Sequence, residues 1–204
     1  MSTVDKGHNT LFPVFLKLEI LNTLIVGGGN VALEKLTAIF NNSPKAKVTL
    51  IAKEINPDVR QFLTERAISF EERAFKMEDT TDIDLAIIAI NDKTASKEIH
   101  DACASKKILT NVADTSDYCD FYLGSIVRKG NLKIAISTNG KSPTIAKRVK
   151  DVLNEAFPDE MEDVLNNMEK IRNSLNGDFS DKVKQLNDIT TVLATKVNSD
   201  LPKK

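Results

Sequence analysis

The chain has 204 residues, of which 41% are hydrophobic and 28% are charged. These fractions are close to the averages of globular proteins, so they exclude a disordered, collagen-like or low-complexity chain. The 28 lysine and arginine residues are balanced by 29 aspartate and glutamate residues, and the net charge of -1 gives no general attraction to a polyanion such as a nucleic acid.

The cysteine, histidine and apolar contents indicate the cellular setting. Two cysteines, Cys103 and Cys119, cannot form a disulfide framework, which fits a reducing cytoplasm. The first ten residues are polar, and the longest apolar run, residues 85–90, is far shorter than the ~20 residues of a membrane helix, so we expect neither targeting nor membrane association. With only His8 and His100 present, we expect no resident metal site, and acid–base chemistry falls to carboxylates.

The first half of the chain is predicted to alternate strands and helices. Short apolar runs predict strands at residues 23–26, 47–52, 68–70, 85–90 and 108–112. Helical spacing predicts helices at residues 32–40, from Pro57 onward, and at residues 94–105. Because the apolar runs are continuous rather than alternating, they indicate a parallel sheet covered on both faces. We therefore expect a Rossmann-like α/β domain over residues 1–113.

The pattern changes after Asp114. Two β-rich runs, 120–127 and 132–137, joined through Arg128-Lys129-Gly130-Asn131, predict an antiparallel hairpin. Ser142-Pro143 then starts a helix, which gives a small α+β segment over residues 114–150. Residues 151–204 are predicted to form a helical domain, with one helix stopping near Gly177, a last helix capped by Ser180, and a frayed end at 201–204.

A glycine motif joins the first predicted strand to the first helix. Gly27-Gly28-Gly29-Asn30-Val31-Ala32 fits G-x-G-x-x-A, with Gly27 for the tight turn, Gly29 for close approach to a pyrophosphate, and Ala32 for close helix packing. The phosphates would meet free N–H groups at the positive end of the helix dipole. The motif predicts dinucleotide binding; the alternative is a glycine turn without a ligand.

Polar residues follow the next strands at the edge where such sheets bind ligands. After the second strand, Glu54 is suited to a ribose 2'-hydroxyl and Lys53 to a 2'-phosphate, so these residues leave NAD and NADP open. Asn91 and Asp92 follow the fourth strand, where Asp92 serves either the cofactor or a helix cap. Asp114 follows the fifth strand and is the first candidate for proton transfer, the alternative being a turn aspartate.

Charge is strongly segregated along the chain. Residues 121–150 contain seven cations and no anion, which suits a substrate with several carboxylates or phosphates. The alternative is a solvated surface balanced by the acidic helices that follow. Nucleic acid is a poorer partner, because aromatic residues make up 5% of the chain and only Phe121 and Tyr122 lie in this stretch. The seven cations are Arg128, Lys129, Lys133, Lys141, Lys147, Arg148 and Lys150.

Four blocks together carry a resemblance to a known family. They are Leu11-Phe-Pro-Val-Phe15, Val26-Gly-Gly-Gly-Asn-Val-Ala32, Asn111-Val-Ala-Asp114 and Ile136-Ser-Thr-Asn-Gly-Lys-Ser-Pro143. Over residues 10–155 the chain resembles the siroheme synthase N-terminal family, the precorrin-2 dehydrogenases and sirohydrochlorin ferrochelatases. It departs from the family at Asn91, where an aspartate is frequent, and at Thr138, where some members carry a phosphorylatable serine.

The resemblance implies NAD-dependent oxidation of precorrin-2 to sirohydrochlorin and, in many members, insertion of ferrous iron. It places Asp114 at the catalytic position and implies a homodimer that exchanges the segment after the Rossmann domain. The alternatives are a dehydrogenase without chelatase activity and a non-enzymatic NAD-sensing module. The NAD contacts expected from the motifs and the resemblance are Gly27, Gly28, Gly29, Asn30, Val31, Lys53, Glu54, Asn91 and Asp92. The residues expected to bind the tetrapyrrole are Arg128, Lys129, Ser137, Thr138, Asn139, Gly140, Lys141 and Ser142.

Overall fold

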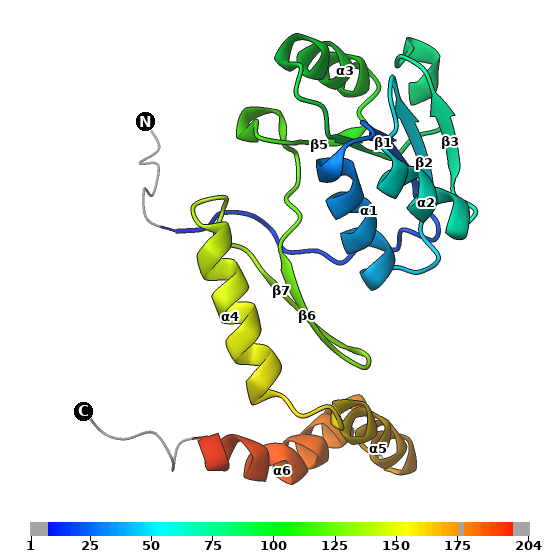
Figure 1. Cartoon of the computed structure of the whole chain (residues 1–204). Helices are drawn as coiled ribbons and strands as arrows, with labels where there is room; N and C mark the ends of the chain where they lie inside the picture. The colour runs from blue at the N-terminus through cyan, green and yellow to red at the C-terminus, as the bar shows by residue number, and fades with distance from the viewer. Residues whose placement is uncertain (1–7, 176–177, 198–204) are drawn as a thin grey trace. The chain divides into compact units, whose positions relative to one another are not determined.

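The computed structural model describes residues 8–175 and 178–197, which fall into two compact units, residues 1–123 and 124–204. The first unit is built on a five-stranded parallel sheet with the strand order β3-β2-β1-β4-β5 (Figure 1). Its strands are β1 (Asn22–Val26), β2 (Lys47–Ala52), β3 (Ser69–Glu72), β4 (Leu85–Ile88) and β5 (Leu109–Val112). Its helices are α1 (Asn30–Asn42), α2 (Pro57–Glu65) and α3 (Lys93–Ser105), with short 3-10 helices η1 (Met77–Thr80) and η2 (Ser116–Tyr118). The predicted Rossmann-like fold is confirmed.

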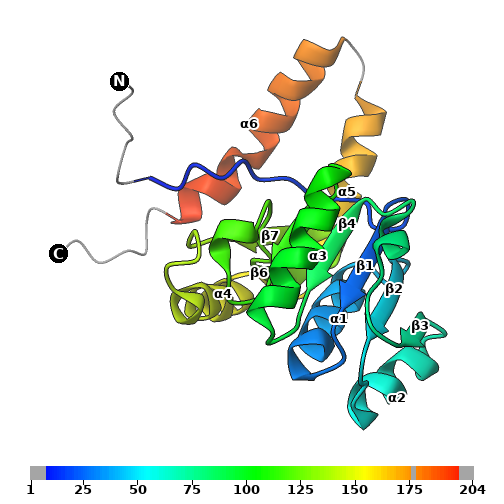
Figure 2. The ribbon, with the colours of Figure 1, turned by 90° about the horizontal axis from the view of Figure 1, so that it is seen from above.

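Helices cover both faces of this sheet, as the continuous apolar runs predict (Figure 2). Ile25 of β1 packs with α1 and α2 on one face, while its neighbours Leu24 and Val26 pack with α3 on the other. The fourth strand is predicted to span the whole apolar run 85–90, but β4 ends at Ile88. The reason is that Ala89 and Ile90 still pack against the two core clusters as the chain leaves the sheet.

The second unit begins with a hairpin of β6 (Ser125–Lys129) and β7 (Leu132–Ile136), on which α4 (Pro143–Ala156) packs. The predicted hairpin is present, but its turn contains only Gly130 and Asn131, so Arg128 and Lys129 lie in β6. Gly130 has φ +58°, a conformation that lets a two-residue turn follow the twist of the strands. The predicted strand over residues 120–124 is absent from the described structure because the Asp120 carboxylate and amide both bond back to Thr110.

Three further features complete the second unit. Ser142 caps α4 by accepting a hydrogen bond from the Ile145 amide, and Pro143 is the first helical residue, as predicted. Helices α5 (Met161–Ser174) and α6 (Phe179–Val197) follow. Asp178, not Ser180, caps α6, since its Oδ1 accepts from the Asp181 amide. The predicted stop at Gly177 and the frayed end at 201–204 lie outside the described residues. Across the part of the chain that the structure describes, no helix combines the length and apolarity needed to span a bilayer.

Candidate functional site

The carboxyl ends of four parallel strands meet at one edge of the first unit. Three backbone hydrogen bonds link the residues just past these ends: Gly27 N–H to the Ile51 carbonyl (2.9 Å), Ala89 N–H to the Val26 carbonyl (2.7 Å), and Ala113 N–H to the Ile88 carbonyl (2.9 Å). The strand order reverses direction between β1 and β4, and ligands of open parallel sheets bind outside this switch point. The structure thus brings the glycine turn, the segment after β4 and the Asp114 turn to one edge.

The three glycines of the turn have different roles. Gly27 has φ +128°, and a Cβ on it would stand 2.2 Å from the Ala89 carbonyl oxygen. A Cβ on Gly28 would stand 2.2 Å from the Glu54 carbonyl oxygen, so this glycine lets the turn pack against the loop after β2. Gly29 is exposed, and a Cβ on it would meet nothing within 4 Å. The side of the turn at Gly29 is therefore open, whereas Gly28 has a packing role that motif reasoning missed.

The amino terminus of α1, as the structure describes it, carries no side-chain cap. Within the described helix α1, no side chain caps the first turn and no acidic residue lies in it, in contrast to the cap that Asn56 provides for α2. Ala32 is fully buried, which allows the close helix–strand packing predicted for it. The exposed Asn30 side chain accepts a hydrogen bond from Asn56 Nδ2 (3.1 Å). Asn56 thus links the starts of α1 and α2. The Asn-Pro pair that it forms with Pro57 is a helix-start pattern that could have identified it from the sequence.

The loop after β2 carries Lys53 and Glu54, both exposed next to the glycine turn. It is pinned by the Asn56 amide, which donates to the Gly28 carbonyl (3.0 Å), and by Glu72 at the end of β3. Glu72 Oε1 accepts from the Ile55 amide (2.9 Å) and Oε2 pairs with Arg60. These two donors hold the pKa of the Glu72 carboxyl below its usual value, so it is ionised at neutral pH. Sequence reasoning missed Glu72, because its pairing depends on the register of an edge strand.

Asp92 is committed to the start of α3. Its Oδ1 accepts from the amides of Thr94 and Ala95, both at 3.0 Å, which makes it the helix cap that was one of its two expected roles. Asn91 precedes it and is exposed at the same sheet edge. Of this pair, Asn91 is therefore the one whose side chain the cap leaves available to a ligand.

Asp114 lies two residues past the end of β5, at the second central position of the Val112–Thr115 turn. Its φ is +58°, in the left-handed region, which costs about 1 kcal/mol for a residue other than glycine. The carboxylate is exposed, and within the described residues no hydrogen bond or ion pair engages it. Such an exposed carboxylate can accept a proton.

The cations of residues 121–150 are divided between the hairpin and α4, with Lys141 in the loop between them. Arg128 and Lys133 are directly opposite each other in the antiparallel register, an arrangement of like charges that suits an anionic ligand. Lys129 is largely buried and forms an ion pair with Asp159. An acidic residue of the turn between α4 and α5 therefore neutralises Lys129, in the way that the solvated-surface alternative proposed for the whole stretch.

The loop between β7 and α4 is held by its own side chains. Asn139 and Gly140 have φ of +53° and +73°, and the Lys141 amide donates to the Thr138 carbonyl (3.0 Å), which closes a tight turn. Thr138 Oγ1 accepts from the Ser142 amide (3.2 Å) and donates to the Ser142 carbonyl (3.1 Å). The Ser137 hydroxyl accepts from the Asn139 amide (3.1 Å). The turn exposes Gly140 and Lys141, a backbone and a cation placed for an anionic ligand.

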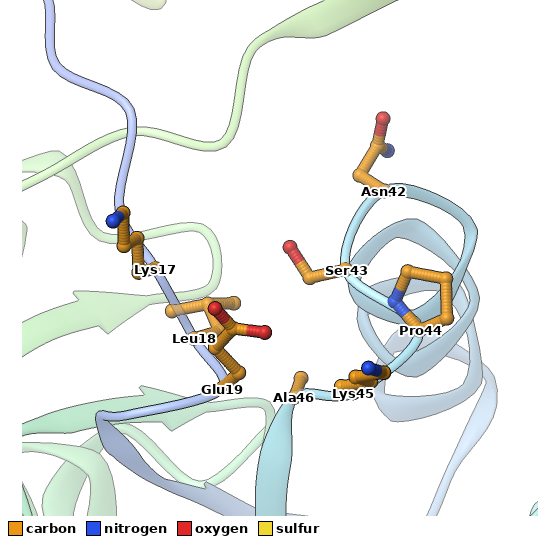
Figure 3. Close-up of a pocket in the computed structure, with 8 residues that line it drawn as sticks. All are labelled: Lys17, Leu18, Glu19, Asn42, Ser43, Pro44, Lys45 and Ala46. Atoms are coloured by element: carbon orange, nitrogen blue, oxygen red, sulfur yellow. The ribbon is translucent and has the colours of Figure 1, made fainter. Parts of the chain in front are cut away.

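A groove elsewhere on the first unit does not belong to this site. It lies between residues 17–19, which lead into β1, and residues 42–46, which join α1 to β2 (Figure 3). The Lys47 amide bonds to the Leu18 carbonyl (2.9 Å) beside it. The groove is thus at the amino ends of the strands, opposite the glycine turn.

In the described ranges, no three His, Cys, Asp or Glu side chains are grouped as a metal site would require.

Comparisons with known proteins match both units. Residues 14–125 match a family model described as "Putative NAD(P)-binding", and residues 129–156 match one described as "Sirohaem biosynthesis protein central". The chain is 37% identical over 138 residues to "Siroheme biosynthesis protein met8" of Schizosaccharomyces pombe, covering 65% of this chain and 52% of that protein. It is 33% identical over 147 residues to "Siroheme synthase" of Psychrobacter cryohalolentis, covering 72% of this chain and 28% of that protein.

The chain thus spans about half, or less, of the length of these relatives. Among solved structures it is similar to "SirC, precorrin-2 dehydrogenase", with a TM-score of 0.70 and 22% identity, over 88% of this chain and 89% of that chain. At this level of identity the likeness is one of fold. The resemblance drawn from the four sequence blocks is confirmed by the family models and the named relatives.

Proposed function

This chain belongs to the putative NAD(P)-binding family, and we propose that it is an NAD-dependent dehydrogenase that oxidises precorrin-2 to sirohydrochlorin. The observation that carries the proposal is the placement of an open glycine turn and an exposed carboxylate at one sheet edge. Gly29 and Asp114 follow β1 and β5, and their turns are joined through β4 by backbone hydrogen bonds. One edge therefore offers both a dinucleotide cradle and a proton acceptor.

The residues present fit NAD. The space above Gly29 and the uncapped first turn of α1 suit the pyrophosphate, and Asn30 and Val31 begin the helix there. Glu54, exposed beside the turn, suits the ribose hydroxyls, and its negative charge disfavours the 2'-phosphate of NADP. Asn91 adds an exposed amide on the far side of the switch point. When bound, NAD supplies the hydride acceptor.

Asp114 is proposed as the base of the dehydrogenation. Oxidation of precorrin-2 to sirohydrochlorin removes two electrons and two hydrogens, one as a hydride and the other as a proton. The exposed Asp114 carboxylate takes that proton and returns it to solvent. The left-handed turn holds this carboxylate beyond the end of β5 rather than against the sheet.

The second unit is proposed to hold the substrate. Precorrin-2 carries acetate and propionate carboxylates at its rim, and these match the cations of the hairpin and the following loop. Arg128, opposite Lys133, and Lys141, in the tight turn, are the cations that we assign to this role, together with polar groups of Ser137, Thr138, Asn139, Gly140 and Ser142. Lys129 contributes only if a substrate carboxylate displaces Asp159.

We also propose ferrous iron as a second substrate. Insertion of Fe²⁺ into sirohydrochlorin releases two pyrrole protons, and Asp114 is placed to collect them as well. The narrower proposal keeps the dehydrogenase alone. The two differ in a single measurement, the rate of siroheme formation with and without the protein.

Assembly and location complete the proposal. We propose three domains: a Rossmann domain at 1–113, a dimerisation segment at 114–150 and a helical domain at 151–204. Ile145 and Val149 are exposed apolar side chains on one face of α4, which supports a homodimer formed through the middle segment, and Val152 continues this face just beyond it. Sedimentation equilibrium of the purified chain should give twice the monomer mass; a monomer would contradict the dimer.

The unpaired thiols of Cys103 and Cys119 support a reducing, cytoplasmic location.

The experiment that tests the proposed function incubates the purified chain with precorrin-2 and NAD, with and without ferrous iron. We expect sirohydrochlorin without iron and siroheme with iron, each followed by its absorbance spectrum. Sirohydrochlorin that takes up iron only at the rate seen without protein would leave the dehydrogenase alone. Unchanged precorrin-2 in a protein that binds NAD would contradict the enzyme and favour an NAD-sensing module.

A further inference from the structure

The segment that follows Asp114 folds back along β5 and is fastened to it. The Asp120 amide donates to the Thr110 carbonyl (2.8 Å), and Asp120 Oδ2 accepts from the Thr110 amide (2.8 Å). The Thr110 hydroxyl is within reach of both the Tyr118 carbonyl (2.9 Å) and Asp120 Oδ2 (3.0 Å). Asn111 Nδ2 donates to the Phe121 carbonyl (2.8 Å). Residues 118–121 are thereby fixed beside the strand independently of the turn that carries Asp114.

The Asp114 turn itself is weakly closed. Its closing hydrogen bond, from the Thr115 amide to the Val112 carbonyl, is long at 3.4 Å. Asp114 also occupies a left-handed conformation that the turn position would normally give to glycine. Backbone of this kind persists when surrounding groups determine it. The turn therefore needs a support outside its own four residues.

Two backbone hydrogen bonds reach the turn from outside, from the Ala113 amide to the Ile88 carbonyl (2.9 Å) and from the Tyr118 amide to the Thr115 carbonyl (3.2 Å). The Cys119 thiol is the side chain that contacts both turn ends. Its Sγ accepts from the Val112 amide (3.3 Å) and lies within donor distance of the carbonyls of Val112 (3.3 Å) and Thr115 (3.4 Å). Val112 and Thr115 are the two ends of the turn, so one sulfur atom bridges them. Burial raises the pKa of the Cys119 thiol, which keeps it protonated and able to donate at neutral pH.

We propose that Cys119 is a positioning residue for the dehydrogenase: its thiol clamps both ends of the Val112–Thr115 turn and so fixes the Asp114 carboxylate at the sheet edge. The inference rests on the proposed function, in which Asp114 takes the proton. Cys119 acts through this turn and does not touch the substrate or NAD. Because Asp120 and Asn111 hold the rest of the segment, loss of the thiol loosens the turn without detaching the segment.

The test compares Cys119→Ala, Cys119→Ser and a matched control, Cys103→Ala. Cys103 is fully buried between α3 and the sheet, so its truncation lowers the unfolding midpoint but leaves kcat for precorrin-2 unchanged. For Cys119→Ala we expect kcat to fall about 10- to 100-fold, as for a misplaced catalytic group, while the Kd for NAD stays within about twofold. Cys119→Ser should recover most of kcat, because its hydroxyl can also accept from the Val112 amide and donate to a carbonyl of the turn.

A double-mutant cycle shows whether the effect passes through Asp114. In an Asp114→Asn background, Cys119→Ala should lower the residual rate by less than about twofold, because there is no carboxylate left to position. Three results would each overturn the proposed role of Cys119. They are a wild-type kcat in Cys119→Ala, a Cys119→Ser variant as slow as Cys119→Ala, and the full loss of rate repeated in the Asp114→Asn background. Full turnover by Asp114→Asn alone would instead remove the proposed base, so the two failures are distinguishable.

Discussion

Alanine at Gly29 separates what the glycine turn does for the fold from what it does for the cofactor. Gly29 has φ -96°, which alanine adopts readily, and its added Cβ would meet nothing within 4 Å. Alanine is a poorer helix cap than glycine by several tenths of a kcal/mol, but it removes about 0.4 to 1 kcal/mol of unfolded-chain entropy. The free energy of unfolding should therefore change by less than about 0.5 kcal/mol.

The neighbouring substitution, Gly28→Ala, gives the contrasting result. Its Cβ would lie 2.2 Å from the Glu54 carbonyl oxygen and 2.9 Å from Ile55 Cα, both backbone atoms that cannot move aside cheaply. Overpacking of this kind costs about 1 to 3 kcal/mol, and the Asn56–Gly28 backbone hydrogen bond would weaken as well. Gly28→Ala should thus be clearly destabilised, whereas Gly29→Ala should not.

For NAD the expected effect of Gly29→Ala is large. In the proposed site the methyl group would stand where the pyrophosphate approaches the first N–H groups of α1, and loss of one charge-assisted hydrogen bond costs about 1.5 to 3 kcal/mol, or about 10- to 150-fold in Kd. Urea unfolding gives the stability and isothermal titration calorimetry gives the Kd. A folded Gly29→Ala protein that binds NAD with wild-type affinity would refute the assignment of the cofactor to this turn.

Three further substitutions test an ion pair, a helix cap and a carboxylate that accepts from the hairpin turn. The hydrogen bond from Arg73 holds the pKa of the Asp79 carboxyl below its usual value of about 4. The ionised carboxylate therefore stabilises the folded protein fully above that pH, and this stabilisation is lost as the pH falls toward the pKa of the folded state. Asp79→Asn should cost about 1 to 3 kcal/mol at pH 7 and progressively less below pH ~4, in urea titrations; a pH-independent difference would contradict this. Asp92→Ala should lower the unfolding free energy by about 1 kcal/mol in the same assay, and no change would argue against its cap. Glu162 accepts from the Asn131 amide (2.6 Å) and Nδ2 (2.7 Å), so Glu162→Ala should speed hydrogen exchange of that amide about tenfold, and an unchanged rate would contradict the contact.

The sequence predicts the first unit well because its signals are local. Apolar runs such as 47–52 and the glycine motif ending at Ala32 determine their strand and helix start through spacing alone. Errors occur where a distant partner decides. Residues 120–124 look β-rich, yet Asp120 is bound to Thr110 ten residues earlier, and no local pattern reveals this.

The site residues show the same division. Gly27, Gly29 and Asp114 could be assigned from their positions after strands, and the structure places all three at the expected edge. Lys129 could not be separated from its neighbours by charge, because its partner Asp159 lies 30 residues later, in the turn between α4 and α5. Sequence spacing identifies the side chains that could take part in chemistry. Contacts with residues distant in the sequence decide which of these side chains are left unengaged in the folded protein.

The most direct test of the account compares the wild-type chain with Asp114→Asn in precorrin-2 oxidation, with NAD as the sole oxidant and reduced nicotinamide as the readout. The wild type should form one NADH for each sirohydrochlorin, and Asp114→Asn should bind NAD with the same Kd but turn over at least ~10²-fold more slowly. Equal rates for the two proteins would contradict the placement of the base at the end of β5.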